Sequence, residues 1–201
     1  LANYVRCLET SQALARAEPA RSDYQQMWAF SCDDMGAILL QQGKRQEALE
    51  SWEKALEIRE RLAKFEPERV DFQWDLAASY NSMGVLVQSL GRFDEAIEWT
   101  RKSNTLLERL ATSQTLPGYF LNDLSISYQR LGELLMMTRQ FAAADTALRR
   151  CLEIRETMAK VEPMDTVVQK GISVVCYYIG NNLRSMGQNK EAMAFFQRSL
   201  E

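Results

Sequence analysis

The sequence predicts an all-α solenoid built from antiparallel helix pairs, and two recurring residues carry this prediction. A glycine returns every 48 residues, and an alanine follows each of these glycines after 12 residues. Self-similarity at a period of this size is typical of repeat proteins, in which each unit covers the apolar face of its neighbour. The recurring positions are Gly36, Gly84, Gly132 and Gly180, followed by Ala48, Ala96, Ala144 and Ala192.

Each period contains two helical patterns separated by a short break. In one period Trp74, Tyr80 and Val87 lie at helical spacings before the break, and Gly91 marks the break itself. Glycine suits the left-handed conformation that commonly follows a helix C-terminus. We therefore expect first helices at 22–42, 70–90, 118–138 and 166–186, and second helices at 44–65, 92–113, 140–161 and from 188 onward.

These helices are expected to form one repeat domain over residues 1–201. Its parts are a partial repeat at 1–18, repeats at 22–65, 70–113 and 118–161, and a truncated repeat at 166–201. The segment LETSQALARAEP is in phase with LEIRERLAKFEP and LEIRETMAKVEP, which end two later second helices. Because the chain begins and ends within helix patterns, we expect either a segment of a longer array or terminal helices that pair between copies of the chain.

Small residues predict where helices cross closely. Gly84 and its equivalents each cost about 1 kcal/mol of helix propensity relative to alanine. Four such costs at one phase indicate a close crossing with the second helix, and we expect Ala96 and its equivalents to face that crossing from the second helix. One junction is irregular, because Pro117-Gly118 replaces the usual proline and Arg139 replaces the glycine of the break. This irregularity predicts a looser turn at 113–118.

Composition narrows the class of function. The chain has 201 residues, 46% of them hydrophobic, and a net charge of −3, which is typical of a folded protein and argues against a nucleic-acid partner. No apolar stretch is long enough to span a bilayer, so we expect no membrane partner. We expect a cytoplasmic protein, because four unpaired cysteines are typical of a reducing compartment. Cys7 and Cys151 are three periods apart, as are Cys32 and Cys176, so each pair is too distant for a disulfide and all four are expected to be buried thiols.

The sequence offers few of the residues and motifs that enzymes use for catalysis. The sequence contains no histidine, so histidine-based acid–base catalysis and imidazole metal ligands are excluded. Glycine-rich phosphate-binding motifs are absent as well. We expect no catalytic residues, no metal and no cofactor, and a helical enzyme is the disfavoured alternative.

The repeated residues resemble the tetratricopeptide repeat. That family has an aromatic position, a Leu-Gly pair, and later an alanine and a small residue. The corresponding residues of one unit are Tyr80, Met83, Gly84, Val87, Ala96 and Ser103. The period of 48 exceeds the usual 34, so the chain resembles the long-repeat variants seen in kinesin light chains and in bacterial multidomain signalling proteins. The resemblance implies a right-handed superhelix of helix pairs.

The same resemblance implies a concave groove, lined by the first helices, that binds a peptide or protein segment. Twelve positions of this chain match the groove of the family: Phe30, Asp33, Trp74, Asn81, Gln88, Asn122, Gln129, Glu133, Lys170, Tyr177, Asn181 and Arg184. Only Asn181, with Lys170 and Arg184 nearby, is similar to the clamp with which some members hold a terminal carboxylate, so we do not expect a full clamp.

The resulting hypothesis is a non-enzymatic scaffold for protein–protein interaction. Two alternatives remain open at this point. One is a regulatory receptor whose groove senses a short peptide, and the other is a self-assembly module whose terminal helices pair between chains. The sequence does not identify the partner.

Overall fold

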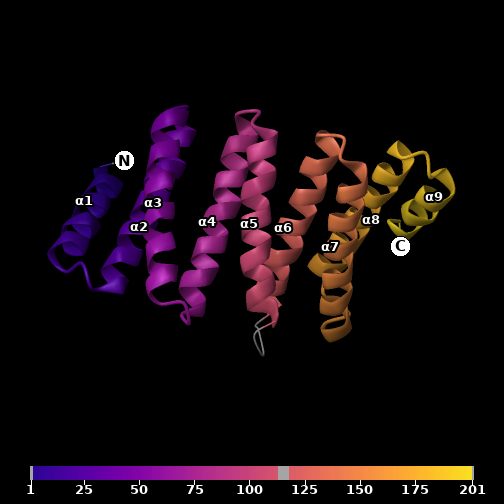
Figure 1. Ribbon diagram of the computed structural model, residues 1–201. Coiled ribbons are helices and arrows are strands. Elements are labelled where there is room, and N and C mark those ends of the chain that lie inside the picture. The colour runs from indigo at the N-terminus through magenta and orange to yellow at the C-terminus, as the bar shows by residue number, and fades with distance from the viewer. Residues whose placement is uncertain (1, 113–117, 201) are drawn as a thin grey trace. The chain divides into compact units, whose positions relative to one another are not determined.

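The computed structural model describes residues 2–112 and 118–200, and within these residues it contains nine α-helices and no strand (Figure 1). The helices are α1 Ala2–Ala17, α2 Ser22–Gln41, α3 Arg45–Phe65, α4 Val70–Ser89, α5 Phe93–Thr112, α6 Gly118–Met137, α7 Phe141–Val161, α8 Thr166–Ser185 and α9 Asn189–Arg198. The helix ends predicted for 22–198 agree with these bounds to within one residue. Residues 113–117, within the predicted looser turn, lie outside the described residues.

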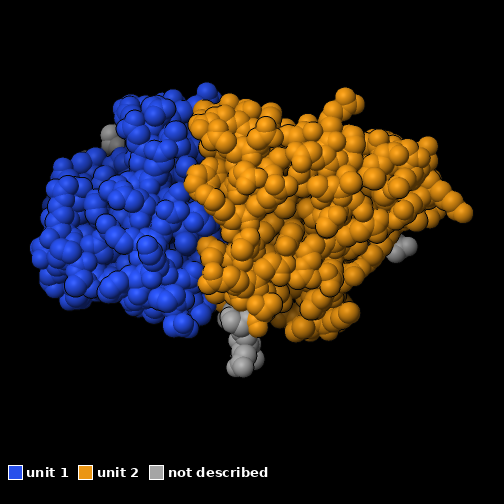
Figure 2. Space-filling view, viewed as in Figure 1, with its two compact units in different colours: residues 1–86 blue, residues 87–201 orange. Residues whose placement is uncertain are grey.

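The chain divides into two compact units, residues 1–86 and residues 87–201 (Figure 2). In unit 1, α1 packs on α2 and α2 packs on α3. In unit 2, the same sequential packing joins α5 to α6, α6 to α7, α7 to α8 and α8 to α9. Helices that pack on their sequence neighbours are the arrangement expected of stacked helical repeats. That the whole chain forms one continuous repeat domain stays a prediction.

The break within each helix pair has the same backbone geometry throughout the chain. Gly43, Gly91 and Gly187 have φ values of 77°, 76° and 78°. After Gly43, the Lys44 N–H donates to the Leu39 carbonyl at 2.9 Å, which closes the first helix with the hydrogen bond typical of a Schellman motif. Arg139 occupies the fourth break with a φ of 60°, so a side chain sits where the other three breaks have glycine.

A buried glutamine joins successive helix pairs in unit 1. The Gln25 Nε2 donates to the Ala15 carbonyl at 2.9 Å, and Gln73 makes the equivalent bond to Ala63 at 2.8 Å. The carbonyl groups near a helix C-terminus have no partner within the helix, so these side chains satisfy acceptors that burial would otherwise leave unpaired. This bond fixes the start of each first helix against the end of the preceding second helix.

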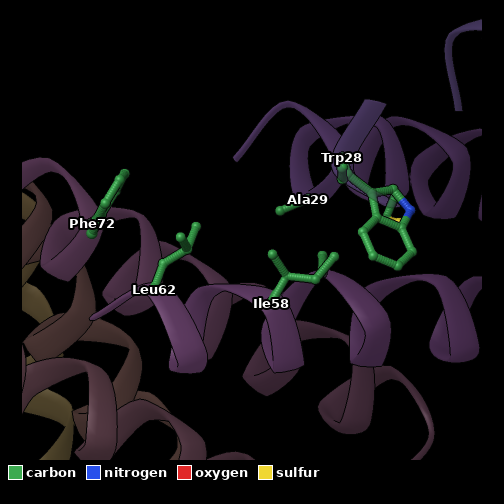
Figure 3. Close-up of a cluster of buried hydrophobic side chains, with 8 residues drawn as sticks. Trp28, Ala29, Ile58, Leu62 and Phe72 are labelled. Atoms are coloured by element: carbon green, nitrogen blue, oxygen red, sulfur yellow. The ribbon is translucent and has the colours of Figure 1, made fainter. Parts of the chain in front are cut away.

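The core of unit 1 lies between its helices. Trp28 and Ala29 of α2 point toward Ile58 and Leu62 of α3, and Phe72 of α4 joins the same cluster (Figure 3). All five side chains are buried. Burying a large apolar side chain contributes roughly 1.5–3 kcal/mol, so this contact stabilises the packing of the helix pair.

Unit 2 has two such clusters. One gathers apolar side chains around Leu134 and Leu135 of α6, and the other gathers them around Leu148 of α7 and Ile179 of α8. Tyr128 and Met136 pack against both clusters, so the core continues from one helix pair to the next.

Three of the four repeated glycines, Gly36, Gly132 and Gly180, lie against a large side chain of the second helix. A Cβ added to Gly132 would lie 2.5 Å from the Leu148 Cγ, and one added to Gly180 would lie 2.6 Å from the Phe196 ring. The Gly36 position meets the Trp52 ring in the same way, at 2.8 Å. The recurring alanines are buried, and at these three crossings the residue four positions after the alanine fills the space that the glycine leaves. The prediction of a close crossing is therefore confirmed at these three glycines.

Ion pairs link successive second helices of unit 2. Arg150 of α7 donates to both carboxylate oxygens of Glu108 on α5, at 3.0 and 3.1 Å, and Arg198 of α9 pairs with Glu156 of α7. Both pairs span 42 residues, so they are the same contact in successive repeats. Arg149 adds a second link to α9 through Glu191, at 2.6 Å.

The cysteines are free thiols, as predicted, but one of them is not buried. Cys32, Cys151 and Cys176 are buried, whereas Cys7 is exposed. Cys7 lines an open hollow of about 440 Å³ between α1 and α2, together with Met27 and Ser31. The expectation of a buried thiol is therefore wrong at this position, because Cys7 lies on the exposed side of α1. Burial raises the pKa of both Cys32 and Cys151 to about 11.

Candidate functional site

The twelve side chains predicted to line a groove are all at least partly exposed on first helices. In unit 1 they are Phe30 and Asp33 on α2, and Trp74 and Asn81 on α4. In unit 2 they are Gln88 at the end of α4, Asn122, Gln129 and Glu133 on α6, and Lys170, Tyr177, Asn181 and Arg184 on α8. The exposed side of the first helices is called the first-helix face of each unit below.

The first-helix face of unit 1 is organised by a buried arginine that sequence analysis missed. Arg59 of α3 is only 4% exposed, and its Nη2 lies 2.5 Å from the Asp33 Oδ2 on α2. Its Nη1 donates to the Ser79 Oγ on α4 at 2.5 Å, and its guanidinium carbon lies 5.1 Å from the centre of the Phe30 ring. A charged group in this environment needs a partner of opposite charge, and Asp33 provides it.

Carboxylates outnumber cations around this cluster. Asp75 of α4 is 9% exposed and accepts a hydrogen bond from the Gln26 Nε2 at 2.8 Å. Burial raises the pKa of Asp33, the Arg59 guanidinium opposes that rise, and the charges of Asp34 and Asp75 add to it. The first-helix face of unit 1 is therefore acidic in this region.

A small cavity opens on the first-helix face of unit 2. It has a volume of about 230 Å³ and is lined by Gln88, Ile126, Gln129, Arg130 and Glu133. The structure thus brings together three of the predicted residues, and the Gln129 Nε2 donates to the Glu133 Oε1 at 2.7 Å. Apolar and amide groups side by side can hold a short segment of peptide through both packing and hydrogen bonds.

Arg130 is a second residue that the sequence did not single out. It makes no hydrogen bond or ion pair with any residue that the structure describes, although Glu133 lies close enough to act on it electrostatically. Burial lowers the pKa of the Arg130 guanidinium, and the charge of Glu133 opposes this effect. Arg130 therefore places a half-buried positive charge beside the cavity.

The α8 part of the face combines an aromatic ring with an ordered amide. Tyr177 is 54% exposed, and its ring lies against Tyr178 and Phe196 at centroid distances of 6.2 and 6.0 Å. The Asn181 amide donates to the Tyr177 carbonyl at 3.1 Å and accepts a hydrogen bond from the Arg184 Nη2 at 2.9 Å. Asn122 and Lys170 are exposed or half-buried on the same face, and neither is joined by a hydrogen bond to the other predicted residues of this unit within the described part of the chain.

Exposed apolar side chains recur at one phase of the first helices. Phe30 in unit 1, and Ile126 and Val174 in unit 2, are exposed and lie at equivalent repeat positions, as does the exposed Ala78. Tyr177 lies one turn beyond Val174 on α8. The repeat thus gives each first-helix face an exposed apolar position at the same phase, which makes each face a candidate binding surface.

A second buried arginine lies in unit 2 at the position equivalent to Arg59. Arg155 of α7 is 8% exposed, its Nη1 donates to the Gly171 carbonyl on α8 at 2.5 Å, and its Nε lies 3.4 Å from the Ser125 Oγ on α6. Both arginines follow the same Leu-Glu-Ile motif, 96 residues apart. That repeated motif is the signal by which the two arginines could have been found in the sequence.

Paired helices of about 20 residues, closed by identical turns and stacked in sequence order, define the class of α-solenoid repeat proteins. Sequence models described as tetratricopeptide repeat match residues 28–66, 76–110, 121–160 and 174–201. The chain therefore belongs to the tetratricopeptide repeat family. The predicted all-α solenoid fold and the predicted family are both confirmed.

Solved structures with the same fold are similar over nearly the whole chain. BtubC (BKLC) from P. vanneervenii is 18% identical, with a TM-score of 0.55 over 98% of this chain and 87% of that chain. The putative kinesin light chain repeats of Podosopora anserina are 17% identical, with a TM-score of 0.53 over 98% and 85%. MamA is 14% identical, with a TM-score of 0.53 over 99% and 88%. No curated protein matches the chain.

Members of this family are typically non-enzymatic scaffolds for protein interaction. Within residues 2–112 and 118–200, no group of three or more His, Cys, Asp or Glu side chains is arranged to hold a metal ion. In that same part of the chain, none of the helices has the length and apolar character needed to cross a membrane. The family and the exposed faces support a role as a protein-interaction scaffold.

Proposed function

We propose that the chain binds an extended peptide segment of a protein partner along the first-helix faces of its repeats. The observation that carries the proposal is the first-helix face of unit 2, where exposed apolar side chains lie beside amides and beside two cations that form no ion pair with the described residues. Ile126, Val174 and Tyr177 offer apolar contact, and Gln129 and Asn181 offer amide groups beside them. Binding interfaces generally combine a few aromatic or aliphatic anchors with surrounding polar contacts of this kind.

The second helices of unit 2 are a poorer candidate. Their charged side chains are largely paired with one another, as in Arg150 with Glu108 and Arg149 with Asp145. On the first-helix face, by contrast, Lys170 and Arg130 form no ion pair with the described residues. Charges that are already paired have less to gain from a partner, so the first-helix face is the better site for recognition.

The proposal is tested by selecting binders from a display library of random peptides with the purified chain as target. Affinities of the selected peptides are then measured for Tyr177→Ala and Asn181→Ala in unit 2 and for Trp74→Ala in unit 1. Thr157→Ala is the matched control, because Thr157 is exposed on α7 and its hydroxyl bonds only within its own helix.

We expect Tyr177→Ala to weaken binding by about tenfold or more, since removal of a central aromatic anchor typically costs more than about 1.4 kcal/mol. Thr157→Ala should leave the affinity unchanged. Recovery of no binding peptide, or binding that responds to Thr157→Ala and to none of the first-helix variants, contradicts the proposal.

A further inference from the structure

The two buried arginines of the chain form an internal comparison, because they occupy the same repeat position with different partners. Arg59 has a carboxylate within hydrogen-bond distance, provided by Asp33. The position equivalent to Asp33 in the environment of Arg155 is Gln129, which carries no charge. The second acidic position nearby, Asp75 in unit 1, is replaced by Gly171. Arg155 has therefore lost both carboxylates that surround its counterpart.

The contacts of Arg155 show how unit 2 accommodates this loss. The Arg155 guanidinium donates to the Gly171 carbonyl. Arg59 instead contacts Ser79, whose repeat equivalent lies one helical turn after Gly171 on α8. A Cβ at position 171 would lie 3.0 Å from the Arg155 Nε, so glycine makes room for this arrangement. The Nη2 of Arg155 forms no hydrogen bond with the described residues, whereas the Nη2 of Arg59 holds Asp33.

A cation that is more than nine-tenths buried and lacks a carboxylate is costly, because a carbonyl and a hydroxyl do not neutralise its charge. The surrounding face adds positive charge, since α6 and α8 together carry three cations and two carboxylates, namely Lys170, Arg130 and Arg184 against Asp123 and Glu133. Glu133 is the acidic groove residue here, and it already accepts a hydrogen bond from Gln129. The first-helix face of unit 2 is therefore complementary to a negative charge.

The side chain that pairs with Arg59 shows that such a charge can reach the arginine from solvent. The Asp33 side chain is 32% exposed, although the Arg59 side chain is 5% exposed. A carboxylate placed over Gln129 would likewise lie at the surface and meet a guanidinium below it. The occupant of this position in unit 1 is a side-chain carboxylate, which favours an Asp or Glu side chain over a chain terminus.

We propose that Arg155 is a recognition residue, and that it binds an Asp or Glu side chain of the partner peptide in the position that Asp33 fills in unit 1. This inference rests on the proposed function, because it names the chemistry that the first-helix face of unit 2 recognises. The partner segment then carries an acidic residue flanked by apolar residues, which pack on Ile126 and Val174.

The test uses the peptides selected from the random display library, synthesised with amidated C-termini so that only side chains carry carboxylates. We expect an acidic residue to be enriched at one position among the selected peptides. Changing that residue to its amide should weaken binding by about tenfold or more, as expected for a charge-assisted hydrogen bond. Arg155→Met should cause a similar loss, and the two changes together should cost little more than either alone.

A second variant keeps the arginine and so does not depend on tolerance of its removal. Gln129→Asp supplies in the same chain the carboxylate that unit 1 has, and it should occupy Arg155 and abolish the preference for an acidic peptide. Gln129→Asn is the matched control, since asparagine has the shape of aspartate without its charge. This variant should retain the preference for an acidic peptide. The Gln129→Asp chain should also unfold at a higher urea concentration than the Gln129→Asn chain.

The outcomes separate this inference from the proposed function. Peptides that bind the first-helix face without enrichment of acidic residues would overturn the inference alone. Additive losses when Arg155→Met is combined with the peptide change would also overturn the inference alone, as would a preference for acidic peptides that survives Gln129→Asp. In either case the cation that binds the acidic residue would be Lys170, Arg130 or Arg184. Recovery of no binding peptide would overturn both.

Discussion

Replacing Gly132 by alanine tests the close crossing of α6 and α7. In an ordinary helix interior this change stabilises by about 1 kcal/mol, because alanine has the higher helix propensity. Here the new Cβ would lie 2.5 Å from the Leu148 Cγ and 2.6 Å from its Cδ2, whereas carbon atoms in good contact lie about 3.5–4.0 Å apart. Leu148 would have to move by about 1 Å.

Leu148 has little freedom to make that move. Its side chain is fully buried and belongs to the cluster that includes Cys151 and Ile179. Overpacking of this kind typically costs about 1–3 kcal/mol, which outweighs the gain in propensity. We therefore expect Gly132→Ala to lower the free energy of unfolding by about 1 kcal/mol, measured by urea denaturation followed by circular dichroism.

The matched background for this measurement is Leu148→Ala, which removes the atoms that clash. Leu148→Ala alone should destabilise by about 2–5 kcal/mol through the cavity it leaves. In that background Gly132→Ala should change sign and stabilise, because its Cβ meets no obstacle and fills part of the cavity. A stabilising Gly132→Ala in the wild-type background would refute the reasoning.

Three further predictions concern stability and reactivity. Arg139→Gly should raise the free energy of unfolding by about 1 kcal/mol in the same urea assay, because φ is 60° at this position and side chains disfavour the left-handed region; no gain would contradict the assigned backbone. Glu108→Gln should lower that free energy by less than about 1 kcal/mol at low salt, with the effect lost at high salt, since it removes the partly exposed pair with Arg150; an effect independent of salt would argue against a role of charge. In the folded chain at pH 8, Cys7 should react with a thiol reagent well before the other cysteines, because Cys7 is exposed whereas burial raises the pKa of Cys151 to about 11; equal rates in a stopped-flow assay would be inconsistent with the fold.

The helices could be predicted from the sequence because their signals are local. Gly43 and Gly91 mark the turns within helix pairs, and the spacing of apolar residues marks the helices themselves. Arg139 could be recognised as a turn residue despite its side chain only because the period of the other breaks identified its position. The repeat thus supplied information that a single unit does not contain.

Packing partners across helices were harder to predict. The close approach at Gly132 follows from the glycine, but the identity of Leu148 as the side chain that fills it depends on how the two helices pack. Exposure of Cys7 also depends on packing, since Cys7 is equivalent in sequence to the buried Cys151. The periodicity alone predicts neither which side chain fills a close crossing nor how completely a given helix is covered by its neighbours.

The candidate site was predicted in part. All twelve predicted side chains are at least partly exposed, because the phase of a residue on a first helix follows from the repeat. Arg59 and Arg155 were missed because arginine within a charged helix usually lies in solvent, and only the crossing of neighbouring helices buries these two. The difference between Asp33 and Gln129 could be interpreted only after the structure had shown that each lies at the position beside a buried arginine.

The most direct measurement is site-specific photo-cross-linking of a selected peptide to the chain. A benzoylphenylalanine is placed at position 126 on α6 in one sample and at position 157 on α7 in another, both of which are exposed in the structure. We predict that the peptide cross-links at position 126 and not at position 157, and that unlabelled peptide suppresses the product. Cross-linking at position 157 alone would contradict binding on the first-helix face.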